Sequence, residues 1–160
     1  MNQTISPANI VLHQIERTTP GTMFSCAGGC IGWAPGAAFG IKLAEPEKTV
    51  IALMGDGAFI YGCPEASLYA AWSHNAPVLL ILYNNRGYGA IKSLFHRNYP
   101  LVNTGADITE PPDYAGIARA CHAFGLTVKE PDEIKPALKE CLSRVKEGQS
   151  AVLDVWIEPV

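Results

Sequence analysis

Several features that mark other classes of protein are missing from this sequence. It has no apolar stretch near the roughly 18–20 residues that a membrane-spanning helix needs, and its N-terminus lacks a basic segment followed by an apolar one. It has no basic stripe, because 12 Lys and Arg stand against 15 Asp and Glu, for a net charge of −3. We therefore expect neither a membrane protein nor a nucleic-acid-binding protein.

Cysteine motifs and the common nucleotide-binding motifs are also missing. Five cysteines are present, but they form no CxxC pair and no zinc-ligand spacing. An odd number of such thiols in an α/β chain is typical of reduced cysteines that fill small spaces in a core, so we expect a cytoplasmic location. Neither a Walker loop nor GxGxxG occurs, which makes a generic nucleotide-binding domain the weakest alternative.

The sequence does contain the pattern of an α/β domain. Thr49–Met54 and Pro77–Tyr83 are short apolar runs without alternation, as in strands buried on both faces of a parallel sheet, and Pro64–Asn75 between them is typical of a helix. With no repeat and no break in composition over 160 residues, we predict one domain with a doubly wound, mostly parallel sheet and helices on both faces. Further strands are expected at Gly125–Lys129 and Ala151–Ile157, and a short strand or an extended segment at Thr22–Cys26. Helices are expected at Asn9–Glu16, Pro35–Leu43, Ala90–His96, Asp113–Phe124 and Ile134–Glu147.

Polar residues follow both central strands. Gly55-Asp56-Gly57 comes after the first, and Asn84-Asn85 comes after the second. Ligands of open α/β sheets bind outside the carboxyl ends of the strands, where both groups fall. Magnesium binds about six oxygens, often one or two from side chains, and Asp56, Asn85 and the Gly87 carbonyl could supply three of them.

The glycines and the loops around these residues suit a phosphate. Gly57 and Ala58 are expected in the loop before the helix, where free backbone N–H groups can hold a phosphate oxygen. A Gly-Asp-Gly triplet alone is also a common turn, but the paired asparagines after the next strand make the signal specific. The stretch from Asn98 to Pro112 is predicted to be a long loop, of the kind that often forms a functional lid.

These motifs resemble those of a known family. Gly55-Asp56-Gly57 with Asn84-Asn85 is similar to the thiamine-diphosphate-binding motif of the acetolactate synthase, pyruvate decarboxylase and benzoylformate decarboxylase superfamily. The glycine-rich segment from Gly28 to Ala38, the Asn85–Gly89 segment and the closing Ala151–Val155 also resemble the C-terminal, diphosphate-binding domain of these enzymes.

The resemblance implies roles for individual residues. Magnesium would be bound by Asp56, Asn85 and the Gly87 carbonyl, and the diphosphate would be contacted by Gly57 and Ala58. The Gly29 carbonyl would accept a hydrogen bond from the cofactor's 4'-amino group. Ile31 would lie between the two cofactor rings. Tyr88 could close over the diphosphate or simply pack against its neighbours. Asn2 and Ser6 could contact the diphosphate, but a chain terminus and a helix N-cap explain them equally well.

The resemblance also implies what this chain would need. The family's activating glutamate lies on a separate pyrimidine-binding domain, and the family's first strand is also expected to be missing. The chain, residues 1–160, would then be a split subunit, a shortened product or a fragment. In each case it would not catalyse alone and would have no catalytic residue of its own. It would also be expected to join a homo- or hetero-oligomer. The implied reaction is decarboxylation of a small 2-oxo acid followed by protonation or carboligation, most similar to acetolactate synthase. Alternatives are an oxidase or an acyl-CoA lyase of the same superfamily, or a non-catalytic cofactor-binding remnant.

Overall fold

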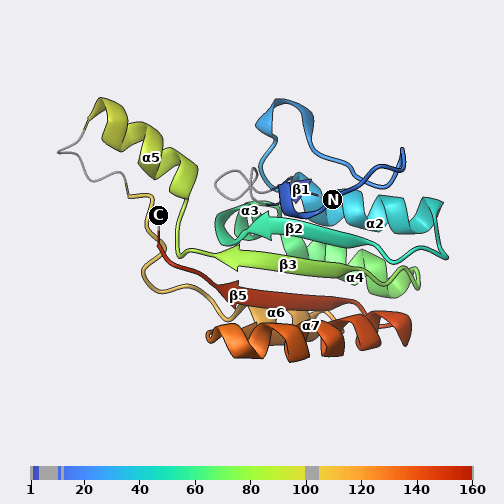
Figure 1. Ribbon diagram of the computed structural model, residues 1–160. Helices are drawn as coiled ribbons and strands as arrows, with labels where there is room; N and C mark the ends of the chain where they lie inside the picture. The colour runs from blue at the N-terminus through green and yellow to red at the C-terminus, as the bar shows by residue number, and fades with distance from the viewer. Residues whose placement is uncertain (1, 4–10, 12, 100–104, 160) are drawn as a thin grey trace.

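A parallel sheet forms the centre of the computed structural model, which describes residues 2–3, 11, 13–99 and 105–159 (Figure 1). All neighbouring strands run parallel, in the order β1-β2-β3-β5-β4. After β3 the chain passes over to the edge strand β4 and then returns to place β5 inside the sheet. The strands are β1 (Asn2–Gln3), β2 (Ile51–Gly55), β3 (Leu79–Asn84), β4 (Phe124–Val128) and β5 (Ala151–Trp156).

Helices cover both faces of the sheet. They are η1 (Ala27–Gly29, a 3-10 turn), α2 (Trp33–Ala44), α3 (Asp56–Tyr61), α4 (Pro64–Ser73), α5 (Gly89–Asn98), α6 (Tyr114–Ala120) and α7 (Pro131–Lys146). Side chains alternate along each strand, so Leu80 and Leu82 join one apolar core and Leu79 and Ile81 the other. The first core includes residues of α2, α4 and α6, and the second includes residues of α7.

Local sequence explains where most helices begin and end. Pro64 occupies the first turn of α4, and the Asp113 side chain accepts a hydrogen bond from Gly116 N–H at 2.7 Å at the start of α6. Glu130 and Glu133 form a capping box at the start of α7. These helices lie within a few residues of their predicted ranges.

Thr22–Cys26, expected to be a short strand or an extended segment, is not a regular strand and has a single isolated bridge, at Ser25. Two other predictions of local structure need correction. The helix predicted for Asp113–Phe124 ends at Ala120, because His122 takes a left-handed φ of 63° and the chain enters β4. Gly57 and Ala58, expected in a loop, lie in the first turn of α3.

Two predictions fall partly outside the described residues. Of the helix predicted for Asn9–Glu16, residues 11, 13 and 14 are helical, and 9, 10 and 12 lie outside that part. The expectation that the family's first strand is missing stays a prediction; the two residues of β1 pair with Leu53 and Met54 of β2. No helix in the described ranges is long and apolar enough to cross a membrane.

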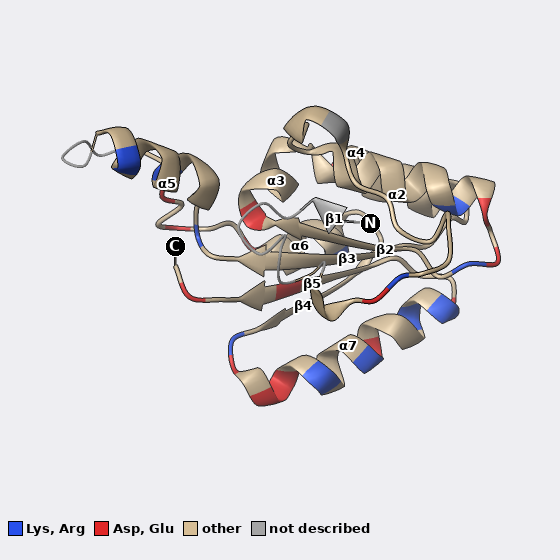
Figure 2. Cartoon of the chain, turned by 45° about the horizontal axis from the view of Figure 1, so that its top comes forward, with Lys and Arg blue, Asp and Glu red and all other residues tan. Residues whose placement is uncertain are grey.

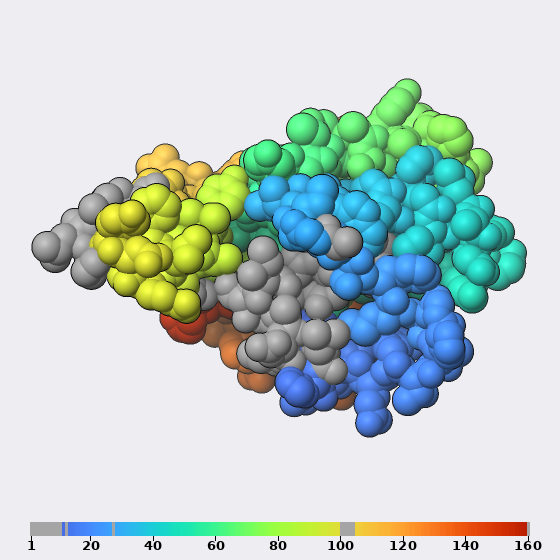
Figure 3. All heavy atoms as spheres, turned by 90° about the horizontal axis from the view of Figure 1, so that it is seen from above, coloured from blue at the N-terminus to red at the C-terminus, as the bar shows by residue number. Residues whose placement is uncertain are grey.

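The carboxyl ends of β2, β3 and β5 meet at one edge of the sheet, which we call the carboxyl edge (Figure 1). From there α5 projects away from the body of the molecule, as the space-filling view also shows (Figure 3, yellow). The carboxyl edge is where the predicted site residues lie.

Candidate cation and diphosphate site

Asp56 is held at the carboxyl edge by the turn from β2 into α3. It directly follows the last residue of β2, is the first residue of α3, and its side chain is 0% exposed. Its Oδ2 accepts a hydrogen bond from Gly87 N–H at 3.1 Å. This bond joins the end of β2 to the turn after β3, two segments that are 31 residues apart in the sequence.

Three potential ligand atoms converge beside Asp56. The end of the Asn85 amide that faces the site lies 3.0 Å from Asp56 Oδ1 and 2.8 Å from the Gly87 carbonyl oxygen. Placed there, the amide nitrogen would donate to both oxygens, whereas the amide oxygen would complete a cluster of three oxygens. A cation bound at about 2.1 Å sets neighbouring octahedral ligands about 3 Å apart, so the spacing fits a magnesium-sized ion. We call Asp56, Asn85 and the Gly87 carbonyl the oxygen trio.

The turn that presents Gly87 is tightly confined. Arg86 takes a left-handed φ of 58°, and residues 106–108 run antiparallel beside it, with Gly87 bridged to Asp107. Tyr88 N–H donates to the Ala106 carbonyl and Ile108 N–H to the Arg86 carbonyl, each at 2.8 Å. A Cβ on Gly87 would lie 2.8 Å from the Ala106 oxygen, so only glycine fits. The described part of the predicted long loop thus lies against the site.

Gly57 and Tyr88 are also packed together. A Cβ on Gly57 would lie 2.7 Å from two atoms of the Tyr88 ring. The first N–H groups of a helix have no partner within that helix, which applies to the turn that contains Gly57 and Ala58. The structure therefore brings Asp56, Gly57, Asn85, Gly87 and Tyr88 together, with Ala58 in the same helical turn as Gly57.

Burial and nearby charges shift the pKa values of the ionisable groups at the site. Burial raises the pKa of Asp56 above its usual value of 3.8, and the N–H groups of Gly57 and Gly87 oppose this rise. The negative charge of Asp154 raises the pKa further. Burial, and then the charges of Asp56 and Asp154, also raises the pKa of the Tyr114 hydroxyl, which makes no hydrogen bond within the described residues. Asp56, Asp154 and the Tyr114 hydroxyl therefore lie close enough at the carboxyl edge for their charges to affect one another.

Gly29 and Ile31 precede Gly32, which lies at the other end of α3. Gly28, Gly29 and Gly32 all have positive φ, and a Cβ on Gly32 would lie 2.6 Å from the Cα of Gly62, which ends α3. The six residues of α3 place this turn about 9 Å from Asp56. Ile31 is half-buried and packs against the first core. Asn2 lies in β1, and Ser6 is outside the described residues.

Sequence reasoning missed two buried polar residues behind the oxygen trio. Asn84 is 0% and Asp154 3% exposed, and Asn84 Nδ2 donates to Asp154 Oδ1 at 2.9 Å. Asp154 interrupts the otherwise apolar strand β5, which was the available signal. Asn84 was noted only as part of the asparagine pair.

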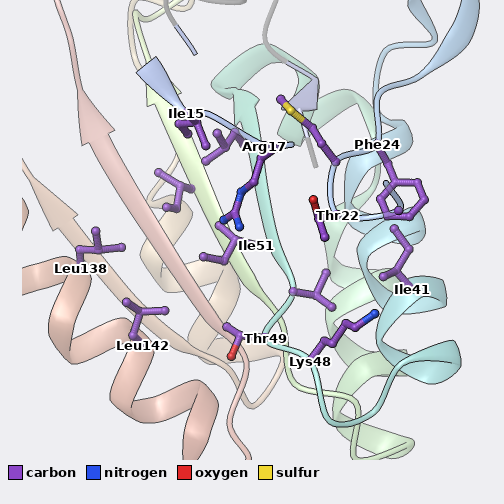
Figure 4. Close-up of a pocket in the computed structure, with 15 residues that line it drawn as sticks. Ile15, Arg17, Thr22, Phe24, Ile41, Lys48, Thr49, Ile51, Leu138 and Leu142 are labelled. Atoms are coloured by element: carbon purple, nitrogen blue, oxygen red, sulfur yellow. The ribbon is translucent and has the colours of Figure 1, made fainter. Parts of the chain in front are cut away.

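A separate hollow lies away from the carboxyl edge (Figure 4). Its volume is about 450 Å³, and it lies between the segment 15–24 and α7, with Ile51, Leu138 and Leu142 in its wall. Most of its lining is apolar and none of it comes from the oxygen trio. Such a lining does not suit a diphosphate. Elsewhere in the described ranges, no group of three or more His, Cys, Asp or Glu is placed to hold a metal ion.

Comparison with known proteins identifies the family. The family described as "Thiamine pyrophosphate enzyme, C-terminal TPP binding domain" matches residues 6–155. The acetolactate synthase isozyme 3 large subunit of Escherichia coli K12 is 30% identical over 130 residues, and a probable acetolactate synthase large subunit of Methanococcus aeolicus is 28% identical over 148. These matches cover 81% and 92% of this chain but only 22% and 24% of the relatives. The chain thus spans about a quarter of their length.

Solved structures agree with this result. A 4-hydroxybenzoylformate decarboxylase from Rhodococcus jostii RHA1, described as thiamine diphosphate-dependent, superposes with a TM-score of 0.84 at 26% identity, covering 99% of this chain and 28% of that one. Benzoylformate decarboxylase from Polynucleobacter necessarius gives 0.83 at 24% identity, over 99% and 30%. The predicted fold class and the predicted resemblance are confirmed.

Proposed function

The chain belongs to the thiamine pyrophosphate enzymes, through their C-terminal TPP-binding domain, and from this we propose that it binds thiamine diphosphate through a magnesium ion held by the oxygen trio. The observation that carries the proposal is the approach of the Asn85 amide to Asp56 Oδ1 at 3.0 Å and to the Gly87 oxygen at 2.8 Å. One carboxylate and two neutral oxygens leave three octahedral positions, which suits an ion that also binds phosphate oxygens and water.

Each residue of the site has a distinct part in this proposal. Asp56 supplies the only negative charge of the trio, and its burial strengthens its attraction for a cation. Gly57 and Ala58 offer backbone N–H groups to the diphosphate, and the Tyr88 ring covers Gly57 from the solvent side. Gly29 and Ile31, one short helix away, would contact the organic part of the cofactor. When bound, thiamine diphosphate supplies the electron sink for reactions at a 2-oxo acid carbon.

For the reaction, we propose decarboxylation of a small 2-oxo acid followed by protonation or carboligation, as in the acetolactate synthases to which the sequence is similar. An oxidase, an acyl-CoA lyase and a non-catalytic cofactor-binding remnant would all use the same oxygen trio. The trio therefore does not favour any one of these alternatives. The activity would belong to an assembly, because a group that activates the cofactor's pyrimidine ring has to come from a second domain or subunit.

The outer surface of α2 and α4 supports such an assembly. Each helix carries one charged residue, Lys42 or Glu65, whereas charged residues of both signs are spread along α7 (Figure 2). Leu43, Tyr69 and Trp72 are each about half exposed on these two helices, at 49%, 56% and 49%. We propose that this surface, rather than α7, associates with the pyrimidine-binding domain or subunit.

Calorimetric titration of thiamine diphosphate tests the proposed binding. Binding is expected in magnesium and is expected to be lost in EDTA. Equal affinity with and without the metal would contradict the proposal. Adding a purified pyrimidine-binding domain of an acetolactate synthase relative, and measuring release of carbon dioxide from pyruvate, then tests the reaction class separately from cofactor binding.

A further inference from the structure

The polar residues behind the oxygen trio form one connected group. Asp154 Oδ1 accepts from Asn84 Nδ2, and Asp154 Oδ2 accepts from the Thr127 hydroxyl at 3.2 Å and from Trp156 Nε1 at 3.3 Å. Asn84 Oδ1 in turn accepts from Arg86 N–H at 3.1 Å. The chain of contacts runs from β4 and β5 to β3, and from there into the turn that carries two members of the trio.

The Asn84 side chain acts directly on that turn. Arg86 has an unfavourable left-handed φ for a residue with a side chain, and the bond from its N–H to Asn84 Oδ1 helps to hold it there. Arg86 lies between Asn85 and Gly87 in sequence. Fixing its backbone therefore fixes the direction of the Asn85 side chain on one side and of the Gly87 carbonyl on the other.

Asp154 in turn fixes the Asn84 amide. With its nitrogen toward the carboxylate, the amide must present its oxygen to Arg86, so only one orientation satisfies both partners. The Asp154 carboxylate is itself held by two neutral donors on its second oxygen, and it is almost fully buried. An apolar pair at these two positions would pack in the core with no need for such donors, so stability alone does not account for them.

We propose that Asp154 and Asn84 are positioning residues for the cation site: the carboxylate orients the Asn84 amide, and the amide holds the turn from Asn85 to Gly87 in its ligand geometry. This inference rests on the proposed cation site. Neither residue contacts the cation itself. Outer residues of this kind are commonly worth about 10–100-fold in metal affinity.

The affinity of the full chain for Mn2+, measured by electron paramagnetic resonance, tests the inference. Asp154→Ala is expected to weaken binding about tenfold or more and to broaden the spectrum of the bound ion. Asp154→Asn is expected to recover part of the affinity lost in Asp154→Ala, since its oxygen can still accept from Asn84 although its NH2 group then faces the Trp156 Nε1 donor. Thr127→Val is the matched control: it removes a bond to the other oxygen of Asp154 and should leave Mn2+ affinity unchanged.

The inference is overturned if folded Asp154→Ala binds Mn2+ as tightly as wild type, or if Asp154→Asn is as weak as Asp154→Ala. Circular dichroism establishes folding of each variant. Should Asp154→Ala fail to fold, Asn84→Ala decides the question with the same expected loss, and unchanged affinity in that variant overturns the inference. A wild-type chain that binds no Mn2+ would instead contradict the proposed function, so the two failures are distinguishable.

Discussion

Asp56 and Asp154 are both buried acidic residues at the carboxyl edge, but their carboxylates have different hydrogen-bond partners, and we propose different roles for them. Asp154 has side-chain donors on both oxygens, from Asn84, Thr127 and Trp156. Asp56 receives the Gly87 N–H on Oδ2, while Oδ1 faces the Asn85 amide beside a carbonyl oxygen. Burial raises the pKa of both. Burial alone therefore does not distinguish the two aspartates, whereas the Asn85 amide and the Gly87 carbonyl oxygen beside Asp56 do.

The largest effect is expected when the charge of Asp56 is removed. Asp56→Ala should weaken magnesium-dependent binding of thiamine diphosphate by more than about 100-fold, since loss of a direct ligand exceeds the usual effect of outer residues. Calorimetry measures the affinity. Asp107→Asn is the control, because Asp107 lies beside the same turn but pairs with Lys92 on the surface. A folded Asp56→Ala variant with wild-type affinity would remove the distinction between the two aspartates.

The next effect concerns the space around Gly57. Gly57→Ala places a Cβ against the Tyr88 ring and should cost about 1–3 kcal/mol, seen as lower thermal stability and about tenfold weaker cofactor binding. Gly55→Ala is the matched control, since a Cβ at Gly55 meets nothing within 4 Å and its φ of −82° is ordinary. Equal behaviour of the two variants would show that the packing of Tyr88 on Gly57 is not restrictive.

A smaller effect is expected from pH in the absence of divalent cations. The folded-state pKa of Asp56 is raised above 3.8, so the folded chain binds a proton at this carboxyl group more tightly than the unfolded chain does. The stability from this group is present below the unfolded pKa and is lost as pH rises through the raised one. Asp56→Asn should thus be more stable than wild type at neutral pH in EDTA.

Thermal unfolding of both proteins between about pH 3 and about pH 8 measures this difference. Asp154 is present in both proteins, but its charge adds to the burial cost of Asp56 only in the wild type. The gap should widen as pH rises, and magnesium should stabilise only the wild type. If the melting temperatures of the two proteins differed by the same amount at every pH, burial of the Asp56 carboxylate would not destabilise the fold.

The smallest effect is expected on the Asp154 side. Trp156→Phe removes the Nε1 donor but keeps an aromatic ring near Lys129 and Arg86. Because Asp154 retains its other donors, the loss in unfolding free energy should be about 0.5–1.5 kcal/mol, with no change in Mg2+ affinity. Denaturant titration measures the stability. A loss above about 3 kcal/mol would mean that Asp154 depends on this one donor.

The sequence was sufficient to predict the sheet, most helices and the meeting of Asp56, Asn85 and Gly87 at one edge. Buried parallel strands leave continuous apolar runs, and their carboxyl ends meet at that edge. The sequence did not predict α3. Ala58, Phe59 and Ile60 are too few to show a helical period, and Gly62 and Pro64 favoured a loop before a single helix.

The contact between Asn84 and Asp154 could not be predicted either. The two residues are 70 positions apart, and they meet only because β5 is inserted beside β3 after the chain has first formed β4. Asp154 in an apolar strand indicated a buried acid without indicating its partner. For Thr22–Cys26, local composition could not decide between a short strand and an extended segment, and the structure shows no regular strand there.

The most direct test of the oxygen trio is anomalous diffraction from crystals grown with Mn2+ and thiamine diphosphate. The account predicts one strong peak at about 2.1–2.3 Å from Asp56 Oδ1, the Asn85 amide oxygen and the Gly87 carbonyl oxygen together. A peak elsewhere on the chain, with the Asn85 amide nitrogen still turned toward Asp56, would contradict it.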